Sequence, residues 1–92
     1  MQIRTGKIIT PIRKMLESGS SNCVIFHCED GYTLQRTRLT VLMARRRNDM
    51  DIRTHKDNLD KLSLIVFEGK RKDIYRTRRD PIEVYISREE QA

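Results

Sequence analysis

The sequence lacks the features that mark several large classes of protein. Its 92 residues contain no apolar run long enough to span a membrane, no signal-peptide pattern, no internal repeat and no low-complexity segment. Charged residues make up 35% and hydrophobic residues 37%, which is polar for a globular domain but outside the composition of a disordered chain. We therefore expect one small cytoplasmic domain over residues 1–92, with an arm or edge strand at 1–7 and a polar tail at 87–92.

The chain also has little that would bind a metal or a cofactor. Its two cysteines, Cys23 and Cys28, lie in CVIFHC with His27 between them, and His55 is the second histidine. Two cysteines do not make a disulfide framework, and a zinc site usually contains a tighter Cys-x2-Cys pair. We predict buried, free thiols with no metal and no cofactor.

Positive charge is what the sequence has in excess, and it is concentrated. The net charge is +6, of which residues 34–56 contribute +5, whereas residues 1–33 contribute +1 and residues 57–92 contribute zero. Within this region, residues 34–48 (LQRTRLTVLMARRRN) combine five arginines with much of the aliphatic content of the chain: Leu34, Leu39, Val41, Leu42 and Met43. A concentrated cationic field is expected of a protein that binds a polyanion, although a solvated charged face is the simpler alternative.

The first helix is predicted over residues 11–18. Thr10 is a suitable N-cap, and Pro11 fits the first helical position because its missing N–H is not needed there. Ile12, Met15 and Leu16 follow at helical spacing on one face. Gly19 suits the left-handed residue that ends many helices.

Residues 22–29 are ambiguous. Ser21 or Asn22 can cap a short helix, but the run Val-Ile-Phe at 24–26 favours a strand, and Glu29-Asp30-Gly31 suits a hairpin turn into a second strand at 32–37. After the arginine-rich segment, strands are predicted over 50–55, 62–69 and 82–86, with a turn at 56–61. In the last of these, Ile82, Val84 and Ile86 share one side. A basic tip at 70–72 leads into a returning strand at 73–77.

The order of helix, short element, basic helix and antiparallel strands resembles the winged helix-turn-helix family of DNA-binding domains, over about residues 8–77. Gly19 and Gly31 are twelve residues apart, the spacing between the end of the first helix and the turn before the recognition helix in that family. Phe26 matches its buried residue of the second helix, and Thr33 matches the residue that caps the recognition helix. The resemblance requires a helix at 22–29 and implies a small α+β domain. Thr37 departs from the family pattern, because an apolar residue is usual there.

The resemblance also implies a site. Side chains at the start of the recognition helix would face the major groove of DNA, where arginine pairs with guanine and glutamine with adenine: Thr33, Gln35, Arg36 and Arg38. Later cations would contact phosphates: Arg45, Arg46, Arg47 and Arg53. The basic tip would act as the wing: Lys70, Arg71 and Lys72.

The function expected from these features is sequence-specific binding of double-stranded DNA by a small, non-enzymatic transcriptional regulator of a bacterium or phage. A homodimer is its expected state, with no membrane partner. Two other classes stay open. One is an RNA-binding protein or a small basic ribonuclease of the toxin class, whose acid–base groups would come from His55, Tyr75, Arg76 and Tyr85. The other is a protein-binding adaptor or inhibitor from a mobile element, which adds a strand to the sheet of its partner.

Overall fold

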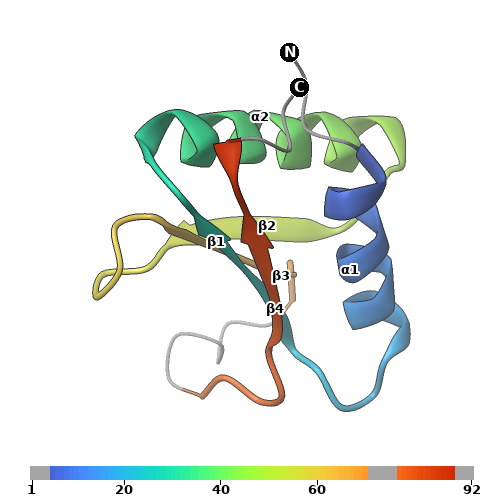
Figure 1. The fold of residues 1–92 in the computed structure, drawn as a ribbon. Coiled ribbons are helices and arrows are strands. Elements are labelled where there is room, and N and C mark those ends of the chain that lie inside the picture. The colour runs from blue at the N-terminus through green and yellow to red at the C-terminus, as the bar shows by residue number, and fades with distance from the viewer. Residues whose placement is uncertain (1–4, 71–76, 89–92) are drawn as a thin grey trace.

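A computed structural model of the chain describes residues 5–70 and 77–88, which form a two-layer α+β domain (Figure 1). The elements in order are α1 (Thr5–Glu17), β1 (Cys23–Cys28), α2 (Gly31–Arg47), β2 (Ile52–Lys56), β3 (Ser63–Glu68) and β4 (Ile82–Ile86). The strands form one mixed sheet in the order β2-β3-β1-β4. β3 pairs antiparallel with both β1 and β2, and β4 pairs parallel with β1. Neither described helix combines the length and apolar character needed to cross a bilayer.

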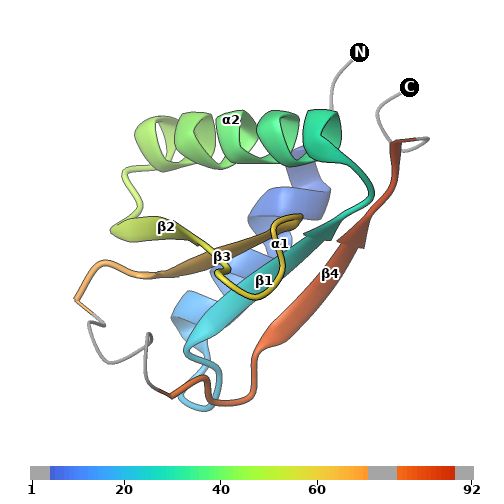
Figure 2. The ribbon, with the colours of Figure 1, turned by 90° about the vertical axis from the view of Figure 1, so that its left-hand side faces the viewer.

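Both helices cover the same face of the sheet. In Figure 2, α1 lies behind the strands and α2 runs along the top, above β2 and β3. Alternate residues of β1 point toward the helices and away from them, so Val24 and Phe26 enter the main core, where they meet Ile8 and Ile12 of α1 and Val41 of α2. A second, smaller cluster is buried on the opposite face of the sheet: Cys23, Ile25, Ile65 and Phe67. β1 is therefore apolar on both faces, as expected for a central strand.

Helix α1 begins six residues before the predicted start at Pro11. Ile8 is fully buried and extends the stripe of Ile12 and Met15 by one turn, and this packing outweighs the cost of a proline inside the helix. Leu16, expected on the buried face, is exposed. The left-handed glycine predicted at Gly19 is also wrong, because no glycine in the described ranges has a positive φ.

The chain instead leaves α1 through a serine turn. Ser18 Oγ accepts hydrogen bonds from the backbone N–H groups of Ser20 and Ser21, at 3.1 and 3.3 Å. These bonds satisfy the N–H groups of two residues that follow the helix, and they hold the turn without a left-handed residue at this position.

The helix over 22–29 required by the resemblance is not formed, because residues 23–28 are the strand β1. Local β-propensity was the better guide at this position, and β1 is held on both sides by β3 and β4. The competing hairpin is also wrong in its second half, since residues 32–37 lie in α2. The strand at β1 removes the helix-turn-helix arrangement, and what remains of the prediction is a small α+β domain with a long basic helix.

The later strands are confirmed. β3 and β4 fall within the predicted segments, and β2 starts two residues later and ends one residue later than predicted, with the turn to β3 close to the expected place. Ile82, Val84 and Ile86 share the side that faces the core. The sheet is mixed rather than purely antiparallel, because β4 runs parallel to β1. The strand predicted at 73–77 lies almost wholly outside the described residues. The arm or edge strand expected at 1–7 is helical from Thr5 onward, as the first turn of α1. At the start of the tail expected at 87–92, the Arg88 backbone N–H donates to Glu29 Oε2 at 2.7 Å.

Candidate nucleic-acid interface

Helix α2 is fixed at both ends by short-range hydrogen bonds. Asp30, and not Thr33, is its N-cap, because Asp30 Oδ1 accepts from the Thr33 backbone N–H at 2.8 Å. This bond also lowers the pKa of Asp30. At the other end Asp49 adopts the left-handed conformation with φ of 49°, and Met50 N–H donates to Arg45 O at 3.1 Å. This closure turns the chain sharply into β2, so the last turn of α2 lies beside the start of that strand.

The buried side of α2 is not its most apolar side. The helix buries four residues against the sheet at helical spacing: Thr33, Thr37, Val41 and Ala44. Thr37 Oγ1 accepts from the Cys28 thiol at 3.7 Å, which shows how a hydroxyl is accommodated in the core. Leu39, Leu42 and Met43 are instead 45, 36 and 49% exposed. Three of the large aliphatic side chains of α2 therefore lie on the outside of the domain.

The exposed side of α2 has an ordered arrangement. One line along the helix runs through Gln35, Leu39, Leu42 and Arg46, at spacings that bring each residue about one turn beyond the last. Helical geometry puts Arg38 and Arg45 on one flank of this line, and Arg36 and Arg47 on the other flank. In Figures 1 and 2 no described element covers the side of α2 away from the sheet. Cations thus border both sides of a mixed polar and apolar line.

Most of these arginines have no side-chain partner among the described residues. Within residues 5–70 and 77–88, the side chains of Arg38, Arg45, Arg46 and Arg47 make no hydrogen bond and no ion pair. The carbonyl end of a helix attracts cations, at about 0.3–1 kcal/mol each, and this accounts structurally for part of the cluster at residues 45–47. It does not account for Arg38, which lies two turns from that end.

Further cations gather near the end of α2. Arg13 of α1 donates to Asn48 Oδ1 at 3.1 Å. Arg53 of β2 lies 3.8 Å from Asp51 and donates to Ile52 O at 3.0 Å. Lys70 is exposed, and its neighbour Gly69 donates its N–H to Asp51 O at 2.8 Å, which brings Lys70 to the same end of the sheet.

A shallow groove of about 950 Å³ runs between α2 and the start of β2. Its lining combines apolar, cationic and acidic side chains: Leu39, Leu42, Met43 and Met50; Arg45, Arg46 and Arg53; Asp49 and Asp51. The apolar part is continuous with the exposed line of α2.

The structure brings many of the predicted site residues to one surface. Gln35, Arg38, Arg46 and Arg47 are exposed on α2, and Arg45 is half-buried there. The predicted contact of Thr33 with the major groove is wrong, because Thr33 is fully buried and its side chain faces the core. Arg36 is half-buried. Arg71 and Lys72 lie outside the described residues.

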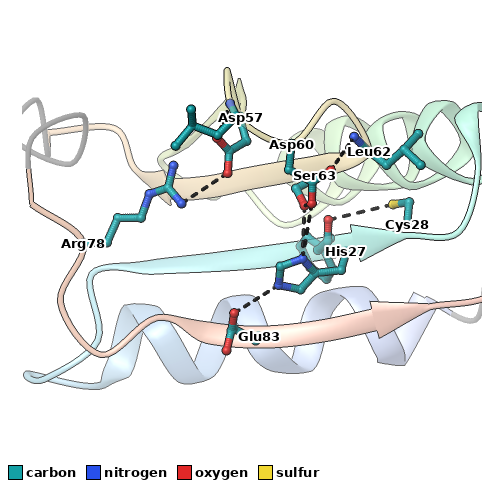
Figure 3. Close-up of polar contacts among 10 residues, drawn as sticks. His27, Cys28, Asp57, Asp60, Leu62, Ser63, Arg78 and Glu83 are labelled. Atoms are coloured by element: carbon teal, nitrogen blue, oxygen red, sulfur yellow. Dashed lines mark hydrogen bonds and ion pairs between the residues drawn. The ribbon is translucent and has the colours of Figure 1, made fainter.

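A second polar cluster, which the sequence did not reveal, lies on the sheet face away from the helices (Figure 3). His27 Nδ1 lies 3.1 Å from Ser63 Oγ, and His27 Nε2 lies 3.1 Å from Glu83 Oε1. The Tyr85 ring stacks on His27 with centroids 4.7 Å apart. Ser63 Oγ donates to Asp60 Oδ2 at 2.6 Å, and this bond is the main cause of a lowered pKa at Asp60. These residues come from β1, β3, β4 and the turn between β2 and β3, so only the folded chain brings them together.

This cluster has the outline of a Ser-His-Glu relay but not its chemistry. Ser63 is 1% exposed and its hydroxyl already donates to a carboxylate, so it is not available as a nucleophile. Both ring nitrogens of His27 are engaged within the protein. Asp60 and Glu83 also give this face negative charge, which disfavours a polyanion. We interpret the cluster as a structural link between three strands.

Among the residues that the structure describes, the other candidates for catalysis or metal binding do not lie together. His55 is half-buried on β2 and borders a small pocket together with Asp57 and Arg78. Asp57 lies 3.3 Å from Arg78, and its pKa is lowered chiefly by the hydrogen bond that it accepts from the Leu59 backbone N–H. Tyr85 is exposed on β4, while Tyr75 and Arg76 lie outside the described residues. Cys23 and Cys28 are free and buried, as predicted, on opposite faces of β1, and burial raises the pKa of both thiols.

Comparison of the chain with protein-family models, with curated proteins and with solved structures gives no match. The assignment of a function therefore depends on the geometry and charge described above.

Proposed function

We propose that the protein binds double-stranded DNA by laying the exposed side of α2 in the major groove. The observation that carries this proposal is the set of four arginines of α2 without partners in the described part of the chain, Arg38, Arg45, Arg46 and Arg47. Arginine is well suited to phosphate because its planar head donates several hydrogen bonds at once. Four unpartnered guanidinium groups on a 17-residue helix favour a partner with regularly spaced negative charge.

The arrangement of the helix suits a groove. A helix with its side chains is about 10–12 Å across, and the major groove of B-DNA is about 12 Å wide. On this proposal Arg38 and Arg45 contact the phosphates of one strand, and Arg47 those of the other. Gln35 and Arg46 lie on the central line and face base edges. These roles differ from those implied by the winged-helix resemblance, in which Arg38 contacts bases and Arg46 contacts phosphate.

The proposal does not need a helix-turn-helix. α2 enters the groove while its other side stays packed on the sheet, and in the chain it follows β1 and precedes β2. Gln35 and Arg46 on the central line support sequence-specific binding, since both side chains pair bidentately with particular bases. A small transcriptional regulator remains the biological role we propose, and enrichment of defined sites from a random duplex pool is the first measurement of it.

The mode of binding is tested by competition. Fluorescence anisotropy with a labelled DNA duplex would be measured against unlabelled duplex DNA, duplex RNA and single-stranded RNA. The major groove of A-form RNA is deep and narrow, so we expect duplex DNA to compete best. Single-stranded RNA competing better than duplex DNA would contradict the proposal and favour the RNA-binding alternative.

Variants then locate the surface. Arg46→Gln and Arg47→Gln remove single charges from exposed side chains of α2, and Lys61→Gln removes one from the exposed turn between β2 and β3. We expect the two arginine variants to weaken duplex binding and the lysine variant to match the wild type. Equal weakening by all three would show a nonspecific effect of net charge and would argue against α2 as the contact surface.

A further inference from the structure

The exposed side of α2 carries large apolar side chains between its arginines. Leu39, Leu42 and Met43 form a contiguous apolar patch on the outer side of the helix, although the same helix buries two threonines. Exposed aliphatic patches of this kind usually mark a contact surface. The patch lies between Arg38 and Arg46, so its partner has apolar groups close to negative charge.

A second copy of the chain does not fit this patch well. Two α2 helices packed antiparallel about Leu42 would bring Arg46 of one copy close to Arg38 of the other, and like charges in contact oppose association. Extension of the sheet is also hindered, because β2, the edge strand beside the patch, carries Arg53 and Lys56. The Arg53 side chain already occupies the Ile52 carbonyl at 3.0 Å.

The major groove of DNA offers one apolar group beside its phosphates, the 5-methyl group of thymine. Building on the proposed function, we propose that Leu39, Leu42 and Met43 contact thymine methyl groups, so that the preferred duplex is rich in thymine opposite the centre of α2. An aliphatic side chain placed against the amino group of cytosine or adenine would remove water from a donor without replacing its hydrogen bond. Against a thymine methyl group, the same side chain buries apolar surface on both sides.

The inference is tested by replacing thymidine with deoxyuridine, which keeps the base pair and lacks the methyl group. The probe is an A·T-rich duplex, titrated at constant salt in its thymidine and deoxyuridine forms. We expect the wild-type affinity to fall about fourfold for each thymine methyl group that is lost from the contact with α2. This factor corresponds to the free energy of removing one methyl-sized apolar group from water. A duplex with deoxyuridine only near its ends serves as the control for general effects of the substitution.

Protein variants make the test specific. Leu42→Ala should bind the thymidine duplex more weakly and should lose most of the difference between the two duplexes. Leu59→Ala is the matched control, because Leu59 is 97% exposed in the turn between β2 and β3. It should keep the wild-type difference. Circular dichroism establishes that both variants retain the fold.

The outcomes separate this inference from the proposed function. If wild type binds both duplexes equally while Arg46→Gln weakens binding, the methyl contacts are refuted and DNA binding by α2 stands. If neither duplex binds, both proposals fail. If sedimentation shows a dimer that Leu42→Ala dissociates, with no difference between duplexes, the patch joins two copies of the chain and the inference is overturned.

Discussion

Replacing Val41 and Met43 by alanine, one at a time, separates the buried side of α2 from its exposed side. Val41 is fully buried in the main core, whereas Met43 is 49% exposed. The loss of two buried methyl groups from Val41, at about 0.8 kcal/mol each, together with the cavity that remains, should lower the free energy of unfolding by about 2 kcal/mol. Met43→Ala should change it by less than about 0.5 kcal/mol, because the side chain is half in solvent and alanine favours the helix.

Circular dichroism during urea and thermal denaturation measures both effects. For a domain of this size, about 1 kcal/mol corresponds to a shift of about 4–8 °C in Tm, so Val41→Ala should lower Tm by about 8–16 °C. Met43→Ala should stay within a few degrees of wild type. If Met43→Ala is as destabilising as Val41→Ala, then α2 packs with a different side against the sheet, and the exposed surface described above is wrong.

Three further predictions concern caps, acid and thiols. Asp30→Ala should lower the free energy of unfolding by about 1 kcal/mol through loss of the helix cap, while Asp30→Ser retains most of it because serine also caps. The pKa values of Asp30, Asp57 and Asp60 are lowered in the fold, chiefly by hydrogen bonds that each carboxylate accepts. Their contribution to stability is therefore complete above the unfolded pKa of about 3.9 and is lost as pH falls below it, so an unchanged urea midpoint at low pH would contradict these contacts. Cys23 and Cys28 should resist alkylation in the native protein and react in urea, and their replacement by alanine should leave duplex binding intact; rapid modification of both native thiols would show that they are accessible.

Much of the sheet could be predicted from the sequence because its signals are local. β3 is a run of β-branched and apolar residues, and β4 alternates apolar and polar side chains. At β1 the local propensity was right, while the spacing of Gly19 and Gly31, interpreted through a family resemblance, was misleading. Two glycines fix only the length of chain between two turns, which a six-residue strand fills as well as a helix does.

The orientation of α2 could not be predicted, for a physical reason. Its buried positions include Thr33 and Thr37, and its exposed positions include Leu39 and Met43, so hydropathy indicates the wrong side. In the folded chain α2 packs its side of smaller residues against the sheet, where the Thr37 hydroxyl meets the Cys28 thiol of β1. The arginines were recognised as a group, but their division into flanks and a central line depends on that orientation.

The network around His27 shows a different limit. Ser63 and Glu83 are 36 and 56 residues away from His27 in the sequence, and they meet it only because β3 and β4 both pair with β1. The parallel pairing of β4 with β1 has no local signal, since it joins segments from opposite ends of the chain. Pairing of this kind follows from the whole topology.

The most direct test of the central claim, that arginines on the flanks of α2 contact phosphates, is the salt dependence of duplex binding. For the wild type, the logarithm of the association constant should fall linearly with the logarithm of salt concentration, with a slope of about −0.9 for each phosphate neutralised. Arg38→Gln and Arg47→Gln should each make the slope less negative by about one unit, and Lys61→Gln should not change it. A wild-type affinity that stays constant between about 50 and 200 mM salt, or flank variants with the wild-type slope, would contradict the claim.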